Sequence, residues 1–268
     1  MDLFKLAIEQ SVSSRFVKPI IKLIGLGEPL LNPNIASMVQ YAKRKKLTVE
    51  LVSNFTLVDP ETLKKLVEAQ LDYLGISLDA ASRQVFERIR AGAKFADVIN
   101  NVKLLLKIRK YMNSVKPKVL FRTTICEDNV GEMQAIVELA RSIPVDSVVF
   151  SKQIISRGGN DVNPRVASAE SEESRGKTSN WINKKAPAIC PAMRRCYITY
   201  DGKVMPCNFL MEIIPRVKYK QFEFGDITRN SVRSVWFSKK YKRFRVGKAL
   251  GFHPYFCQSC TSISIGDW

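Results

Sequence analysis

Short apolar runs alternate with longer amphipathic stretches along the first 150 residues. Five runs are almost continuously apolar and rich in β-branched residues, at residues 20–27, 47–54, 71–79, 118–126 and 145–151. Such runs are typical of strands covered on both faces, and the stretches between them repeat apolar residues at helical spacing. Strands that alternate with helices predict βα units around a parallel sheet. Five such units fit a partial or full barrel and also an open doubly wound sheet.

The pattern changes after residue 151. Residues 152–188 are polar and rich in Ser, Asn and Gly, which predicts a linker or a mobile loop. A cysteine-rich segment begins at residue 189 and contains the hairpin signal CYITYDGKVMPC, with Asp201-Gly202 at the turn. We therefore expect an α/β domain over residues 1–151, a linker over residues 152–188 and a small cysteine-rich domain over residues 189–268.

The composition adds a net charge of +18, from 43 Lys and Arg against 25 Asp and Glu. Such an excess fits a surface for nucleic acid or for an acidic peptide, and it also fits a solvated basic face. We favour the solvated face and expect no nucleic-acid partner, because no RNA-binding signature accompanies the charge.

Nothing in the sequence predicts a membrane protein. No apolar run approaches the roughly 18 residues that cross a bilayer. The N-terminal residues lack the basic start and apolar core of a signal peptide. We therefore expect a cytoplasmic protein that has no membrane partner.

The cysteines form the strongest chemical signal. Five of the six lie in the last third of the chain: Cys190, Cys196, Cys207, Cys257 and Cys260. Cys257 and Cys260 form a CxxC, whose spacing lets two thiolates bind one metal, and the hairpin can bring Cys196 and Cys207 together. We expect a four-thiolate site of Cys190, Cys207, Cys257 and Cys260, with Cys196 as a spare or substitute ligand. An iron–sulfur cluster and a structural zinc both fit, and we favour iron–sulfur because a zinc ribbon usually has a CxxC in each half.

A second signal lies where the first strand ends, in the stretch GLGEP. Gly25 and Gly27 allow a ligand to approach the backbone closely, and Glu28 can accept hydrogen bonds from an ammonium group. A tight turn between strand and helix explains the same residues without a ligand. Polar residues also end the other predicted strands: Ser53, Asn54, Ser77, Asp79, Arg122 and Thr124. Together they would line one mouth of a barrel, where parallel sheets place their sites.

These stretches resemble radical S-adenosylmethionine (SAM) enzymes that carry a C-terminal SPASM or twitch domain. GLGEPLLNP resembles the GGEP motif, with Leu26 in place of its first glycine, and SNF resembles the TNG segment, with Phe55 in place of glycine. YLGISLDAASRQVFERIRAG is similar to the stretch that begins SLDG. CPAMRRCYITYDGKVMPCNFL, followed by FGDI, SVWFSKKYKRFR and CQSC, is similar to the SPASM pattern, and Cys190, Gly202 and Cys207 meet its spacing.

The resemblance implies a partial parallel (β/α) barrel of radical SAM type, followed by a small cysteine-rich domain with a β-hairpin. It places Gly27, Glu28 and Pro29 at the methionyl amino group of SAM. It places Asn54, Ser77 and Arg122 near the ribose or carboxylate of SAM. The C-terminal cysteines would bind one auxiliary 4Fe–4S cluster, because the chain lacks the further cysteines of a two-cluster domain.

The resemblance further implies an enzyme of the oxidoreductase or maturase type. Such an enzyme cleaves SAM reductively and uses the 5′-deoxyadenosyl radical to take hydrogen from a peptide or a small cofactor precursor. It also needs an electron donor. The auxiliary cluster would anchor the substrate or pass an electron.

The chain departs from the family in one respect, because it contains no CxxxCxxC, the motif that holds the SAM-cleaving cluster. Either the sequence is truncated or the protein is a degenerate relative that keeps only the auxiliary cluster. We favour truncation, because a barrel without its first strand exposes a sheet edge. The main alternative function is therefore a non-catalytic iron–sulfur or peptide-binding protein. A zinc-stabilised nucleic-acid binder is a further alternative.

Overall fold

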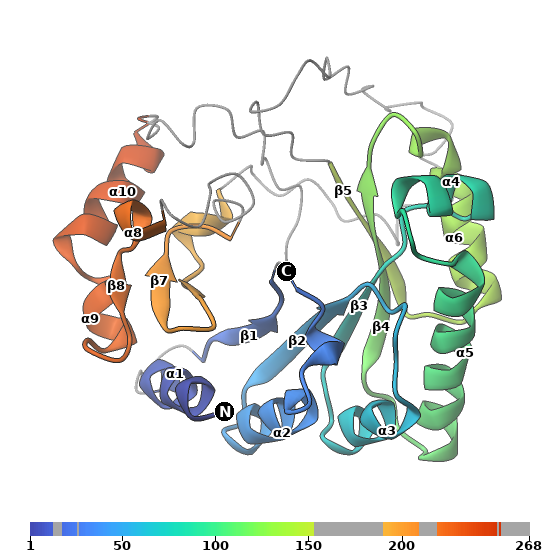
Figure 1. Cartoon of the computed structure of the whole chain (residues 1–268), viewed down its shortest axis with the longest axis horizontal. Helices are drawn as coiled ribbons and strands as arrows, with labels where there is room; N and C mark the ends of the chain where they lie inside the picture. Colours follow the sequence, from blue (N-terminus) through green and yellow to red (C-terminus); the bar gives the residue numbers. More distant parts are fainter. Residues whose placement is uncertain (13–17, 26, 153–189, 209–218, 251, 253–268) are drawn as a thin grey trace. The chain divides into compact units, whose positions relative to one another are not determined.

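The computed structural model describes residues 1–12, 18–25, 27–152, 190–208, 219–250 and 252 (Figure 1). These residues form two compact units. One contains residues 20–152, and the other contains residues 1–12 together with residues 190–208, 219–250 and 252. Most of the expected linker at 152–188 lies outside the described residues, as do Cys257 and Cys260.

The first unit is built on a five-stranded sheet in the order β1-β2-β3-β4-β5, and every neighbouring pair is parallel. The strands are β1 (Ile20–Leu23), β2 (Thr48–Ser53), β3 (Tyr73–Ser77), β4 (Lys118–Ile125) and β5 (Ser147–Lys152). All five predicted strands are confirmed. Each strand pairs with the next in sequence, which is the order of a barrel, whereas a doubly wound sheet reverses its order at a switch point.

Five helices cover one face of this sheet: α2 (Ile35–Arg44), α3 (Pro60–Glu68), α4 (Arg83–Ile89), α5 (Phe95–Tyr111) and α6 (Met133–Ser142). Figure 1 shows them on the convex side of the curved sheet, as right-handed crossovers require. In β4 the side chains of Val119 and Phe121 are buried, whereas the alternating Leu120 and Arg122 are half-buried. One face of β4 is therefore more deeply buried than the other. No described helix is both long and apolar enough to cross a bilayer.

Two aspartates join neighbouring strands at their amino-terminal ends. The carboxylate of Asp72 accepts hydrogen bonds from the backbone N–H of Val49 (2.9 Å) and from Nζ of Lys43 and Lys116 (2.5 Å each). Asp146 likewise accepts from the N–H of Val119 (2.8 Å). Burial acts to raise the pKa of Asp72, but its hydrogen bonds outweigh burial and hold the pKa below the ordinary value of 3.8.

Replacing Asp72 with asparagine is expected to lower the free energy of unfolding at pH 7 by about 2 kcal/mol, because charge-assisted hydrogen bonds are lost. A carboxyl whose pKa is lower in the folded state stabilises the fold at pH values above its pKa in the unfolded state. This stabilisation is lost as the pH falls through the pKa of the folded state. The difference between the two proteins should therefore shrink near pH 3. Urea unfolding at both pH values measures it, with exposed Asp97→Asn as the control. An equal difference at both pH values would contradict the assignment.

The second unit contains a three-stranded antiparallel sheet of β6 (Tyr197–Ile198), β7 (Lys203–Met205) and β8 (Gly225–Asp226). The predicted hairpin is confirmed, and its turn residue Gly202 has φ +85°, a conformation that favours glycine. Around the sheet lie α8 (Tyr219–Phe222), α9 (Val232–Trp236), α10 (Lys239–Ala249) and the 3₁₀ turn η4 (Pro191–Met193).

The N-terminal helix α1 (Asp2–Val12) also lies in this second unit, although the sequence pattern grouped it with the sheet. Gln10 connects it to the chain more than 200 residues later, because its Nε2 donates to the carbonyl of Ile227 (3.1 Å). The Oε1 of Gln10 accepts from the N–H of Val232 (2.8 Å). Leu3 and Ala7 pack against the core of the unit, whose buried members are Ala192, Val204, Ile227, Val235, Tyr241 and Phe244.

Candidate functional site

A cavity of about 290 Å³ opens where β1, β2 and β3 end, the edge at which parallel sheets bind ligands. Its lining consists of Ile24, Gly25, Gly27, Glu28, Val52, Ser53, Asn54, Ser77 and Arg90. Six residues named in the sequence analysis thus lie together: Gly25, Gly27, Glu28, Ser53, Asn54 and Ser77. Pro29 begins the adjoining 3₁₀ turn η1 (Pro29–Leu31).

Glu28 connects the ends of two strands. Its Oε1 accepts from the backbone N–H of Leu30 (3.0 Å), which caps η1, and its Oε2 accepts from the N–H of Asn54 (2.7 Å). Each carboxylate oxygen has a second lone pair, so the side chain retains acceptor capacity towards the cavity. A Cβ on Gly27 would meet nothing within 4 Å. The missing side chain at Gly27 therefore leaves open space beside the cavity.

Asn54 is fixed by a turn of its own. Its Oδ1 accepts from the N–H (3.0 Å) and Oγ1 (2.8 Å) of Thr56, as in an Asx turn. Its Nδ2 has no hydrogen-bond partner among the described residues, so its donors remain available. The next residue, Phe55, adopts φ +58°, the left-handed conformation that favours glycine. Burial of the Phe55 ring and a hydrogen bond from Nδ2 of Asn101 to the Phe55 carbonyl (3.0 Å) hold this conformation.

Arg90 lines the cavity although the sequence analysis did not select it. It follows α4 in the stretch IRAG, which was quoted for the resemblance without assigning this residue a role. Its Nη2 and Nε lie 2.6 and 2.7 Å from Oδ2 of buried Asp79. The other oxygen of Asp79 accepts from the N–H of Thr124 (2.7 Å). The cavity therefore combines a carboxylate, an amide, a hydroxyl and a guanidinium, which together suit a zwitterionic ligand.

Arg122 does not line this cavity. It pairs with Ser77 in the sheet register, but its Nη1 donates to Oε1 of Glu50 (2.9 Å), which also forms an ion pair with Lys22 (2.8 Å). The side chain reaches Glu50 across Gly75, where a Cβ would lie 2.5 Å from Cδ of Arg122. Its guanidinium thus contacts Glu50, and contact with SAM stays a prediction for this residue.

Three of the five predicted metal ligands lie in the second unit. Cys190, Cys196 and Cys207 are half-buried and pack against its core. The β6–β7 register pairs Tyr197 with Met205. Cys196 comes just before Tyr197 and Cys207 comes two residues after Met205, so both lie at the open end of the hairpin. Burial raises the pKa of the Cys196 thiol to about 12, and the charge of Arg245 opposes this rise. No metal-binding group of three Cys, His, Asp or Glu exists within the described residues, which exclude Cys257 and Cys260.

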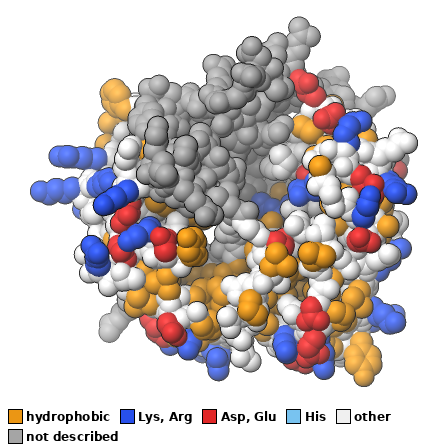
Figure 2. All heavy atoms as spheres, in the orientation of Figure 1, with side chains coloured by type: hydrophobic (Ala, Val, Ile, Leu, Met, Phe, Trp, Pro, Cys, Tyr) orange, Lys and Arg blue, Asp and Glu red, His pale blue; other side chains and the backbone are white. Residues whose placement is uncertain are grey.

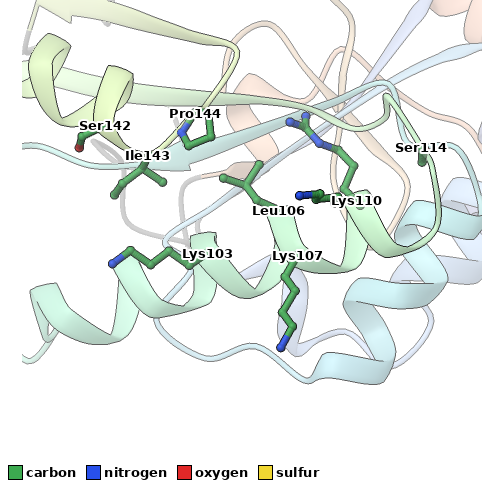
Figure 3. Close-up of a pocket in the computed structure, with 9 residues that line it drawn as sticks. Lys103, Leu106, Lys107, Lys110, Ser114, Ser142, Ile143 and Pro144 are labelled. Carbon is green, nitrogen blue, oxygen red and sulfur yellow. The ribbon is translucent and has the colours of Figure 1, made fainter.

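A cavity of about 550 Å³ lies along α5, away from the strand ends (Figure 3). Lys103, Lys107 and Lys110 line it, but Figure 3 shows Lys107 on the side of the helix opposite Pro144, so the lysines do not converge. Arg109 is engaged by Asp146 (2.6 Å). On the face shown in Figure 2, acidic side chains lie among the Lys and Arg side chains. These observations agree with a solvated basic surface.

Comparison with known proteins places these features in a family. The chain matches the Radical SAM superfamily over residues 20–140. It matches SPASM, an iron–sulfur cluster-binding domain, over residues 190–261. The first match contains the cavity at the strand ends, and the second contains all five C-terminal cysteines.

Two curated relatives and one solved structure illustrate the likeness. The chain is 30% identical to the AdoMet-dependent heme synthase of Methanosarcina barkeri, over 82% of this chain and 68% of that protein. It is 24% identical to the tungsten-containing aldehyde ferredoxin oxidoreductase cofactor-modifying protein of Pyrococcus furiosus, over 93% of this chain and 75% of the relative. The crystal structure of Streptococcus suis SuiB bound to the precursor peptide SuiA superposes with a TM-score of 0.69 at 13% identity. That superposition covers 97% of this chain and 62% of SuiB.

The matched families account for both units of the fold. The heme synthase is similar along most of both chains, and the SuiB structure shares the fold. The chain therefore belongs to the radical SAM superfamily and carries a SPASM iron–sulfur cluster-binding domain.

Proposed function

We propose that this chain is the SAM-binding and iron–sulfur-binding part of a radical SAM enzyme that modifies a peptide or a cofactor precursor. The observation that carries the proposal is the cavity at the strand ends, where Glu28, Asn54 and Ser77 meet. SAM, when it is bound and reductively cleaved, supplies a radical that removes hydrogen from a substrate. The residues of this chain would bind and orient it.

The donor set of the cavity fits SAM. The free acceptor capacity of Glu28 suits the methionyl ammonium group, and the open space beside Gly27 allows that group to approach. Pro29, which the resemblance places at the same group, begins the adjoining turn η1. Nδ2 of Asn54 and Oγ of Ser77 suit ribose or carboxylate oxygens. Arg90, held by Asp79, adds a fixed cation at the wall for a carboxylate. Contact between Arg122 and SAM, which the resemblance implies, remains a proposal, because Arg122 pairs with Ser77 in the sheet register but its guanidinium contacts Glu50.

The second unit would hold one auxiliary 4Fe–4S cluster on Cys190, Cys207, Cys257 and Cys260, with Cys196 as the substitute ligand. Partly buried thiols in one core, beside a cation, suit a four-thiolate cluster that carries negative charge. Such a cluster would anchor substrate or pass an electron, and the reaction requires an electron donor. We infer a cytoplasmic setting, where thiols remain reduced.

The substrate class is supported by the relatives. One relative is named for heme synthesis, one for cofactor modification, and SuiB is bound to a precursor peptide. A peptide or a cofactor precursor is the class that these names share, and the chain spans only part of each protein.

Cleavage of SAM further requires the CxxxCxxC cluster, which this sequence lacks. Within the described residues β1 pairs only with β2 and leaves Ile20 52% exposed. An apolar edge strand of this kind is where a further strand would pair. We propose that the missing motif is supplied by such a strand.

The test is to purify the native protein anaerobically from its source cells, measure its intact mass, and assay 5′-deoxyadenosine after adding SAM and dithionite. We expect a mass above 30.4 kDa and formation of 5′-deoxyadenosine. A mass of 30.4 kDa without 5′-deoxyadenosine would refute the enzyme and leave a non-catalytic iron–sulfur protein.

A further inference from the structure

Arg245 in α10 contains a buried polar atom that no described residue satisfies. Its Nη1 has no hydrogen-bond partner in the described structure, although the atom is shielded from solvent. Charged side chains are rarely buried without a partner, and an unpaired charged donor costs more than a neutral one. A buried unsatisfied group in a native fold usually indicates a missing water, ion or ligand.

The rest of the Arg245 side chain is held in place. Its Nη2 donates to the carbonyl of Trp236 (2.8 Å). Its guanidinium carbon lies over the ring of Trp236, 4.1 Å from the centroid, and over the ring of Tyr241, at 4.8 Å. Tyr241 is itself fully buried, and its hydroxyl donates to the carbonyl of Arg195 (3.0 Å). These contacts hold the guanidinium in one orientation, so the unpaired Nη1 donor has a fixed direction within the core.

The cysteines occupy the same core. Cys190, Cys196 and Cys207 pack against the cluster that contains Tyr241, and Trp236 packs there too. Arg245 is near enough to Cys196 for its charge to lower the pKa of that thiol against the effect of burial. The neighbouring exposed cations of α10, such as Arg243, lie on the solvent side of the helix.

We propose that Nη1 of Arg245 donates a hydrogen bond to a sulfur of the auxiliary iron–sulfur cluster, so that the half-buried Arg245 acts as its counter-charge. This inference rests on the proposed cluster and adds a positioning residue that the cysteine pattern does not identify. A 4Fe–4S cluster with four thiolates carries roughly two negative charges when oxidised and one more when reduced. The vacant donor and the fixed positive charge both match that anion.

The expected consequence is on the reduction potential. A nearby cation and a hydrogen bond to sulfur stabilise the reduced, more negative form more than the oxidised form. Arg245 therefore raises the potential of the cluster. Removing its charge should make the cluster harder to reduce without removing any ligand to iron.

The test uses the full chain, reconstituted anaerobically with iron and sulfide, in four forms: wild type, Arg245→Gln, Arg245→Lys and Arg243→Gln. Arg243→Gln is the matched control, because it removes the same charge from an exposed position of the same helix. Iron content and circular dichroism establish loading and folding. A redox titration followed by electron paramagnetic resonance gives the potential of the cluster.

We expect Arg245→Gln to shift the potential downward, Arg245→Lys to lie between it and wild type, and Arg243→Gln to match wild type. If Arg245→Gln does not fold, Arg245→Lys tests the proposal in its place. A cluster in Arg245→Lys with the same reduction potential as in wild type then overturns the proposal. Equal potentials in Arg245→Gln and wild type overturn it as well, and so does an equal shift in Arg243→Gln. A wild-type chain that binds no iron, or binds zinc instead, refutes the cluster itself, which is a separate failure.

Discussion

Replacing both Cys190 and Cys207 with alanine is expected to remove the cluster from the reconstituted chain. Wild-type protein should retain about four iron atoms per chain after desalting with a chelator. The double variant should retain less than about half an iron atom per chain. Two of the four proposed thiolates are lost, and the remaining CxxC cannot complete the coordination of a cluster. Iron and sulfide assays, with the visible absorption spectrum, measure the result.

Three single variants sharpen this experiment. Cys126→Ala removes a half-buried thiol of the sheet unit and should leave the iron content unchanged. Cys196→Ala should also retain the iron, because Cys196 is proposed as the spare ligand. Full iron in the double variant would contradict the ligand set. If Cys196→Ala loses iron and Cys190→Ala retains it, Cys196 is the cluster ligand and Cys190 is the spare cysteine.

The fold was predictable where one local pattern determines it. Continuous β-branched runs predicted all five parallel strands, because strands covered on both faces need apolar residues at every position. The Asp201-Gly202 pair predicted the hairpin, since its turn requires positive φ. The barrel order could not be separated from a doubly wound order, because strand order depends on pairing between distant segments.

The partners of individual side chains were less predictable. The amphipathic pattern of α1 shows that it needs an apolar partner, but it does not show that the partner begins near residue 190. Arg245 belongs to the excess of basic residues that was interpreted as a solvated face. Within its helix, Tyr241 and Phe244, three residues apart, mark the buried side. Arg90 could have been selected from the stretch IRAG, whereas the path of Arg122 across Gly75 becomes visible only in the sheet register.

Replacing Glu28 with alanine is expected to weaken SAM binding at least about tenfold, or about 1.4 kcal/mol. The substitution removes the acceptor proposed for the ammonium group. It also leaves the N–H groups of Leu30 and Asn54 without their partner, so the wall of the cavity loosens. We expect the free energy of unfolding to fall by about 2 kcal/mol as well. Isothermal titration of the folded chain with SAM measures the affinity.

Glu132→Ala separates the two effects of that substitution. Glu132 is also a carboxylate that accepts from two backbone N–H groups, those of Ala81 (2.7 Å) and Ser82 (2.9 Å), but it does not line the cavity. Its loss should destabilise the fold by a similar amount and leave SAM affinity unchanged. Glu28→Gln keeps one acceptor oxygen without the charge and should fall between wild type and Glu28→Ala. If Glu28→Ala binds SAM as tightly as Glu132→Ala does, Glu28 only closes the turn between β1 and η1, and the ammonium group is bound elsewhere.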